Sequence, residues 1–185
     1  PLLKPALLSS LDIQFHPLTI GIAIGIIIVL LLLLSSALIS GSEVAYFSLN
    51  AGDKQKLKKK SKTNQRVLAN LESPEKLLAT ILVANNFVSI GIIILTTYII
   101  NNVVTIQNSP LIEFILQVVL ITFILLLIGE IIPKVYASHF ALGFARFMAI
   151  PLQVLGKIFQ PVNSILIYST SFVNRRLQKH RKEIS

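Results

Sequence analysis

The stretch Leu18–Ser42, LTIGIAIGIIIVLLLLLSSALISGS, decides the fold class because none of its residues is charged. From residue 21 to residue 34 it contains only Ile, Leu, Val, Ala and Gly. About 20 consecutive apolar residues are enough to span the hydrocarbon core of a bilayer as a helix. The sequence therefore predicts a first transmembrane helix, which we place at about residues 18–49.

Two further stretches have the same character. Residues 77–100 carry no charge and follow Ser73-Pro74-Glu75, which is typical of a helix start, with Pro at the first helical position and an acid in the first turn. Residues 114–132 are interrupted only by Glu130 and are followed by Pro133-Lys134. We place the second and third spans at about residues 74–101 and 112–134, so that the transmembrane domain covers residues 18–134.

The composition agrees with an all-α integral membrane protein that has the lipid bilayer as its main partner. The chain has 185 residues, of which 54% are hydrophobic and only 14% charged. It has no cysteine, which excludes thiolate metal sites and disulfides, and its three histidines lie far apart in the sequence. The net charge of +9 does not indicate nucleic-acid binding, because the basic residues gather beside the spans.

The distribution of basic residues predicts the orientation. The loop from Asn50 to Lys76 holds eight Lys and Arg, whereas the loop from Asn101 to Leu111 holds none. By the positive-inside rule the first loop is cytoplasmic, so the N-terminal segment 1–17 lies outside and the segment 135–185 inside. We therefore interpret the run Lys58-Lys59-Lys60 as a topology signal and favour this over an anionic-lipid or nucleotide site. The expected location is the cell (inner) membrane.

The segment 140–173 is apolar but contains Arg146 and Lys157 and is interrupted by Pro151 and Pro161. A fourth span here would carry the five basic residues of the tail, Arg175, Arg176, Lys179, Arg181 and Lys182, across the membrane. We therefore predict one or two Pro-bent helices in the interface, with Arg146 and Lys157 reaching lipid headgroups.

Polar side chains inside a span are costly and often mark an ion path. Ser36 and Ser40 are four residues apart, on one face of the first helix, and are followed by Ser42 and Glu43. Asn85 and Asn86 lie about nine residues, or roughly 13 Å of helix rise, into the second span. These groups can share one depth with the third polar cluster, Gly129–Lys134.

Within that third cluster, Pro133 has no N–H, so the Gly129 carbonyl loses the helical donor four residues on. A free carbonyl beside the Glu130 carboxylate can ligate a cation. Together the three clusters offer hydroxyl, amide, carbonyl and carboxylate oxygens, which select hard cations such as Mg²⁺, Ca²⁺ or Na⁺ over transition metals.

Each cluster also has a purely structural interpretation. Ser36 and Ser40 can bond back to carbonyls of their own helix, and Asn85 and Asn86 can join helices. Glu43 and Glu130 can pair with Lys54 or Lys134, an alternative that we favour for Glu43 and not for Glu130. The occurrence of all three clusters at similar depth favours the ion site.

Three ordered motifs resemble the transmembrane domain of the CorC/cyclin M (CNNM) family of Mg²⁺ transporters, in its bacterial members. They are SALISGSEVA from Ser36 to Ala45, LVANN from Leu82 to Asn86, and GEIIPK from Gly129 to Lys134. The resemblance implies three spans, a basic cytoplasmic helical hairpin at residues 50–73, and a juxtamembrane belt helix within 135–185. It also implies regulatory CBS domains downstream, which are absent here.

The resemblance further implies a homodimer with Mg²⁺ as the transported ion, Na⁺ as the coupling ion, and export by alternating access. Carried over by motif, the metal ligands are Ser36, Ser40, Asn85, Glu130 and the Gly129 carbonyl. The matching neighbours support these ligands or line an Na⁺ path; they are Ser42, Glu43, Asn86 and Pro133.

Two other functions compete with transport. A membrane-anchored scaffold or accessory subunit, for example one associated with gliding motility, would use the same polar groups for assembly alone. An enzyme is not predicted, because no nucleophile, base and orienting group can be assembled from these residues.

Overall fold

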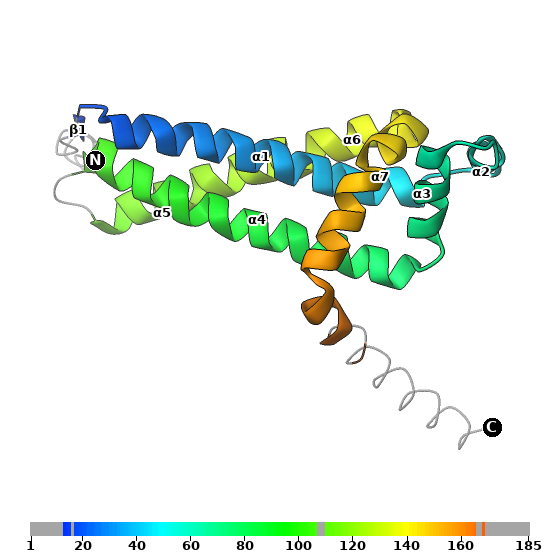
Figure 1. Cartoon of the computed structure of the whole chain (residues 1–185). Helices are drawn as coiled ribbons and strands as arrows, with labels where there is room; N and C mark the ends of the chain where they lie inside the picture. The colour runs from blue at the N-terminus through cyan, green and yellow to red at the C-terminus, as the bar shows by residue number, and fades with distance from the viewer. Residues whose placement is uncertain (1–12, 16, 107–109, 166–167, 169–185) are drawn as a thin grey trace, which may run out of the picture. The chain divides into compact units, whose positions relative to one another are not determined.

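The computed structural model describes residues 13–15, 17–106, 110–165 and 168, and in these ranges nearly every residue is helical. Figure 1 shows the helices and strands along the chain. Most of the predicted extracytoplasmic segment 1–17 lies outside the described residues. So do the five basic residues of the predicted tail, Arg175, Arg176, Lys179, Arg181 and Lys182.

Four helices of the described part are long and apolar enough to cross a membrane. They are α1 (Ile20–Phe47), α4 (Pro74–Val103), the continuous helix Leu111–His139, and α7 (Ala141–Ile158). The prediction of a helical membrane protein is confirmed. The number of spans is not decided by length, because α7 qualifies as well, although it is the least apolar of the four.

The third of these helices is built from three successive elements. They are α5 (Pro110–Ile124), the π-helix η1 (Leu125–Ile131) and α6 (Ile132–His139). Helical structure therefore continues through Pro133, where the sequence suggested that the span is closed, and ends six residues later.

The chain divides into two compact units. Unit 1 comprises residues 1–37 and 88–132, and unit 2 comprises residues 38–87 and 133–185. The chain passes from one unit into the other within α1, within α4, and between Ile132 and Pro133.

Unit 1 contains a small two-stranded sheet that the sequence did not predict. Strand β1 (Ile13–Phe15) pairs antiparallel with β2 (Val104–Ile106), with Ile13 opposite Ile106. Helix α1 begins shortly after β1, where the Thr19 hydroxyl accepts a hydrogen bond from the Ile22 N–H at 3.4 Å. The sheet therefore joins the start of α1 to the end of α4.

Glycines allow α1 and α4 to approach each other in unit 1. A Cβ at Gly25 would lie 3.3 Å from the Ile99 Cδ1 atom, and a Cβ at Gly91 would lie 3.6 Å from the Leu32 Cδ1 atom. Small residues permit such close packing of helices in a membrane.

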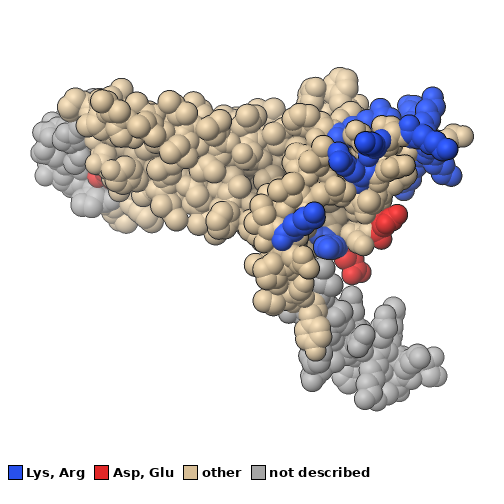
Figure 2. Space-filling view, in the orientation of Figure 1, with Lys and Arg blue, Asp and Glu red and all other residues tan. Residues whose placement is uncertain are grey.

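Unit 2 contains two short helices, α2 (Ala51–Leu57) and α3 (Lys62–Leu71), over which many Lys and Arg side chains gather (Figure 2). Asn50 caps α2, because its Oδ1 accepts the Asp53 N–H at 2.8 Å. The buried Asn64 amide donates to the Lys56 and Lys59 carbonyls at 3.3 and 3.0 Å. This amide therefore fixes the connection between the two helices.

Helix α7 is attached to the rest of unit 2 by polar contacts. Arg146, which we expected at lipid headgroups, donates its Nε–H to Asn64 Oδ1 at 3.0 Å. The buried Tyr46 hydroxyl donates to the Ala145 carbonyl at 3.1 Å. Asn70 donates to the Tyr46 hydroxyl at 2.9 Å and to the Ala149 carbonyl at 3.2 Å. Helix α7 therefore packs along the basic helix α3.

Gly41 of α1 leaves room for an aromatic ring of α7. A Cβ at this position would lie 2.7 Å from Phe144 Cζ, closer than real Cβ contacts allow. Gly41 is buried, as are its neighbours Ser40 and Ser42.

Candidate functional site

The serines of α1 differ in how their hydroxyls are used. Ser42 is fully buried and donates to the Leu38 carbonyl at 2.7 Å, the usual back-bond of a serine in a membrane helix. Ser40 is only 1% exposed, and its hydroxyl has no hydrogen-bond partner among the described residues. The back-bond that we considered for Ser40 is therefore not formed. An unpaired buried hydroxyl costs about 1–3 kcal/mol.

Ser36 lies against Gly129 within unit 1. Both residues are buried, and a Cβ at Gly129 would lie 3.1 Å from Ser36 Oγ and 3.7 Å from Ser36 Cβ. The absence of a side chain at position 129 thus allows the third helix to approach the Ser36 hydroxyl. Two of the five predicted ligands are in contact here.

The π-helix η1 occupies the position where the sequence predicted a free carbonyl. The Ile132 N–H bonds to the Leu127 carbonyl, five residues earlier. The Ile128 carbonyl would next require an N–H from Pro133, which has none. The N–H of Lys134 can serve either Gly129 or Glu130, five or four residues before it. The π register therefore shifts the loss of a donor from Gly129 to Ile128, and the Lys134 N–H remains available to Gly129 or Glu130.

The two acidic residues of the predicted motifs have different surroundings. Glu43 pairs with Lys134, one of the two lysines that the sequence offered as its partner, with Oε2 and Nζ 3.0 Å apart. Glu130 is half-buried, and no hydrogen bond or ion pair of its carboxylate is found in the described part of the chain. Glu130 is therefore the acidic side chain of the motifs that is left for a ligand.

The asparagines of α4 also differ. Asn85 is half-buried, whereas Asn86 is exposed. Of the five predicted ligands, Ser36, Gly129 and Glu130 belong to unit 1, and Ser40 and Asn85 belong to unit 2. Across residues 13–15, 17–106, 110–165 and 168, no three His, Cys, Asp or Glu side chains come together.

Sequence reasoning overlooked polar groups elsewhere in the apolar helices. Gln117 of α5 is 8% exposed and donates to the Thr97 carbonyl at 3.2 Å. The buried Thr96 hydroxyl has no hydrogen-bond partner among the described residues. A lone amide in the middle of an apolar run is itself a signal, since such a group needs a partner in hydrocarbon.

Asn163 was missed for a different reason. It lies in the segment that we treated as interfacial, yet it is buried and donates to the Thr80 hydroxyl of α4 at 2.8 Å. Nothing in the spacing of its neighbours indicated this contact.

Comparison with known proteins adds a family assignment to this geometry. The model of the cyclin M transmembrane N-terminal domain matches residues 26–185. No curated protein matches the chain.

Proposed function

The chain belongs to the cyclin M transmembrane-domain family, and from this premise we propose that it exports Mg²⁺ across the cell membrane in exchange for Na⁺. The family assignment makes it a membrane domain of the divalent-cation transporter family. The ion, the direction of transport and the coupling to Na⁺ are the parts that we propose.

The proposed binding site uses Ser36, Ser40, Asn85, Glu130 and the Gly129 carbonyl. The buried Ser40 hydroxyl without a partner is the observation that carries it. A hydroxyl in this state destabilises the protein unless a ligand supplies the missing interaction. A cation does so, because it attracts the hydroxyl oxygen.

The chemistry of this donor set favours a hard divalent cation. All five donors are oxygens, which suit Mg²⁺ and Ca²⁺ better than transition metals. A single carboxylate neutralises only half of the ion's charge, so the remaining ligands must hold it through their dipoles. The packing of Ser36 against Gly129 supports this assignment, because it brings two of the predicted ligand residues together.

The π-helix supports the alternating-access part of the proposal. A wide turn breaks the regular hydrogen-bond ladder and is frequent at functional sites. In η1 the Leu127 carbonyl accepts the Ile132 N–H, and the Ile128 carbonyl cannot receive a bond from Pro133, which has no N–H. A small change of register in this turn would alter which carbonyl is available to the ion.

We propose three spans with the N-terminus outside, as charge predicts, and treat α7 as a helix of the cytoplasmic interface. The bonds from Arg146 to Asn64 and from Asn70 to the Ala149 carbonyl support this topology. They hold α7 beside α3, which carries Lys62 and Arg66. Helix α3 is too charged to lie in hydrocarbon.

The first experiment measures the thermal stability of the detergent-purified chain against Mg²⁺ concentration. Because the chain has neither Trp nor Cys, the fraction that stays monodisperse after heating is followed by size-exclusion chromatography. A ligand that binds only the folded state at 100 times its Kd stabilises it by about 2.7 kcal/mol. We expect saturable stabilisation by Mg²⁺ in the wild type.

Two pairs of variants make the experiment specific. Glu130→Ala and Ser40→Ala should lose the Mg²⁺ response, whereas Glu113→Ala in the first turn of α5 and Ser35→Ala should keep it. Ser35 is a suitable control because it is exposed and its hydroxyl already bonds to the Leu31 carbonyl at 2.8 Å. An unchanged Mg²⁺ response in Glu130→Ala would refute the proposed site.

The rival function is a membrane scaffold without transport. It is favoured by the bonds from Gln117 to the Thr97 carbonyl and from Asn163 to the Thr80 hydroxyl, where polar groups join separate helices. A scaffold predicts that no cation changes the stability of any variant. Proteoliposomes loaded with a Mg²⁺ indicator provide the second readout, since an Na⁺ gradient should drive Mg²⁺ movement only in a transporter.

A further inference from the structure

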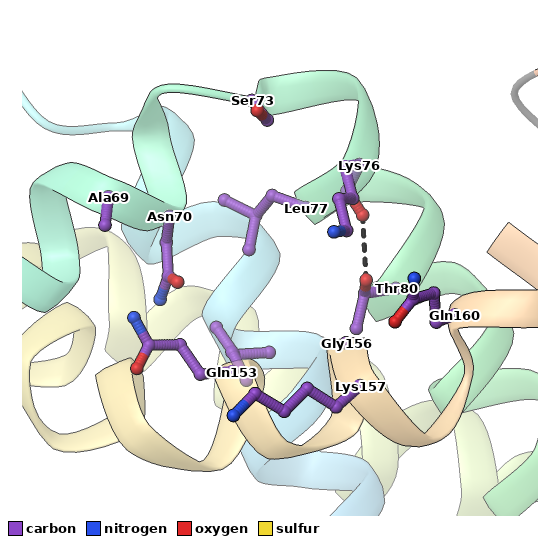
Figure 3. A pocket seen from close by; sticks show the side chains of 11 residues that line it. Ala69, Asn70, Ser73, Lys76, Leu77, Thr80, Gln153, Gly156, Lys157 and Gln160 are labelled. Atoms are coloured by element: carbon purple, nitrogen blue, oxygen red, sulfur yellow. Dashed lines mark hydrogen bonds between the residues drawn. The ribbon is translucent and has the colours of Figure 1, made fainter. Parts of the chain in front are cut away.

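A cavity of about 420 Å³ lies within unit 2, between the α3–α4 corner and α7 (Figure 3). Small-molecule sites have volumes of roughly 300–1,000 Å³. The lining residues are Ala69, Asn70, Ser73, Lys76, Leu77, Thr80, Leu152, Gln153, Gly156, Lys157 and Gln160. None of the predicted cation ligands is among them.

The base of the cavity is fixed by packing and hydrogen bonds. Thr80 donates to the Lys76 carbonyl at 2.8 Å and accepts from the Asn163 amide at 2.8 Å. A Cβ at Gly156 would lie 3.6 Å from Thr80 Oγ1, so α4 and α7 touch at this level. Leu77 and Leu152 are buried beside it. The cavity is therefore formed by the fold and does not depend on the position of a single loop.

The polar side chains of the cavity include two positively charged lysines and several hydrogen-bond donors. Figure 3 shows Lys76 on the α4 wall and Lys157 on the α7 wall, with the Gln153 and Gln160 amides nearby. No carboxylate is among the described residues that line it. Lysine binds phosphate as a point charge, and amides add hydrogen bonds. We propose that this cavity binds a phosphate group, presented by the headgroup of an anionic phospholipid.

The surroundings favour a lipid over a free phosphate. Lys157 lies on α7 between Val154 and Ile158, which are 50% and 62% exposed. A helix with exposed apolar residues beside a lysine suits the membrane interface, where anionic headgroups are concentrated. Glu72 and Glu75 line a neighbouring hollow that shares Ser73 and Lys76. Their negative charge opposes the approach of a highly charged free phosphate more than that of a singly charged headgroup.

The test compares two double variants with the same change of charge. Lys76→Gln with Lys157→Gln removes the cavity cations, and Lys58→Gln with Lys60→Gln removes two exposed lysines outside it. Each detergent-purified protein is heated with added phosphatidylglycerol, with phosphatidylcholine, or with sodium phosphate against sodium chloride of equal ionic strength. Size-exclusion chromatography measures the temperature at which half of the protein remains monodisperse.

Phosphatidylglycerol should raise this temperature in the wild type by roughly 2–4 °C, the shift that corresponds to about 1 kcal/mol in a chain of this size. The rise should be saturable and should exceed that with phosphatidylcholine. It should be lost in the cavity variant and kept in the control variant. Lys76→Arg with Lys157→Arg should keep it, which separates loss of charge from misfolding.

The other outcomes are equally decisive. A rise with sodium phosphate that the cavity variant loses supports the phosphate site and assigns a soluble source. Three results would overturn the proposal. They are equal loss of the phosphatidylglycerol response in both Gln double variants, an equal rise of the temperature in both, and no rise in the wild type. Because the cavity contains no cation ligand, the cavity variant should keep its Mg²⁺ response, so failure here is distinguishable from failure of the transport proposal.

Discussion

The Ser36 hydroxyl lies beside the backbone of Gly129, so close that a Cβ on Gly129 would come within 3.1 Å of its oxygen. These two residues lie 93 positions apart in the sequence and on different helices. Their contact brings together two residues that belong to separate sequence motifs.

Replacing Gly129 with Ala should therefore weaken Mg²⁺ binding. The added methyl group pushes against Ser36 Oγ, which must move by a few tenths of an ångström or turn away. We expect a loss of affinity of about tenfold, equivalent to roughly 1.4 kcal/mol, measured from the Mg²⁺ dependence of thermal stability.

Gly143→Ala is the matched control, because a Cβ at Gly143 meets nothing within 4 Å. Since Ala is a better helix former than Gly by about 1 kcal/mol, this variant should be at least as stable as the wild type. An equal loss of Mg²⁺ affinity in both glycine variants would show that the contact with Ser36 is not the cause.

Ser40→Ala should have opposite effects on stability in the absence and in the presence of Mg²⁺. Without the ion, removal of the unpaired buried hydroxyl should raise the free energy of unfolding by about 1–3 kcal/mol. With saturating Mg²⁺ the variant should be less stable than the wild type, because it has lost a ligand. Thermal unfolding with Mg²⁺ and with a chelator measures both values.

Ser42→Ala provides the comparison, since the Ser42 hydroxyl is already bonded to the Leu38 carbonyl at 2.7 Å. The effect of Ser42→Ala on stability should have the same sign with saturating Mg²⁺ and with a chelator. A Ser40→Ala protein that is destabilised equally with and without Mg²⁺ would contradict the assignment of Ser40 as a ligand.

Asn64→Ala should loosen both the α2–α3 connection and the attachment of α7. The substitution removes bonds to the Lys56 and Lys59 carbonyls and to the Arg146 Nε–H. Loss of a buried, fully bonded amide is expected to cost about 1–3 kcal/mol. Limited trypsin digestion should then cut more rapidly after the lysines between α2 and α3, whereas Asn102→Ala, at an exposed helix end, should leave the rate unchanged.

Gly41→Ala should destabilise unit 2, because its Cβ would lie 2.7 Å from the Phe144 ring. Overpacking of this kind costs typically about 1–3 kcal/mol. Adding Phe144→Leu to Gly41→Ala should restore part of the lost stability, because leucine is smaller than phenylalanine. Failure of this second substitution to restore any stability would show that the clash is not the cause.

The class of fold could be predicted because hydropathy is a property of long segments. The helices α1 and α4 and the third helix follow from uncharged runs, and no tertiary contact is needed to see them. The β1–β2 pair could not be found in this way. Each strand has only three residues, and they come from opposite ends of the helices that they join.

Some contacts around the proposed site were predictable from the sequence, for a similar reason. Pro133 predicted a disturbed helical hydrogen-bond ladder, because proline has no backbone N–H in any context. Whether the helix breaks, kinks or widens into a π turn depends on the packing around it. The π register of η1 could therefore not be predicted from the sequence. The pairing of Glu43 with Lys134 could be anticipated from charge, whereas the choice of Asn64 as the partner of Arg146 could not.

The β1–β2 pair has a mechanical consequence for any cycle of opening and closing. It ties the segment before α1 to the end of α4 through a ladder in which Ile13 is opposite Ile106. Sliding of α1 along α4 within unit 1 would shear these backbone hydrogen bonds, so we expect the unit 1 parts of the two helices to move together. We then expect the third helix to move relative to α1 and α4. It leaves the α-helical register at Leu125, and a change in its pitch there would leave the sheet intact.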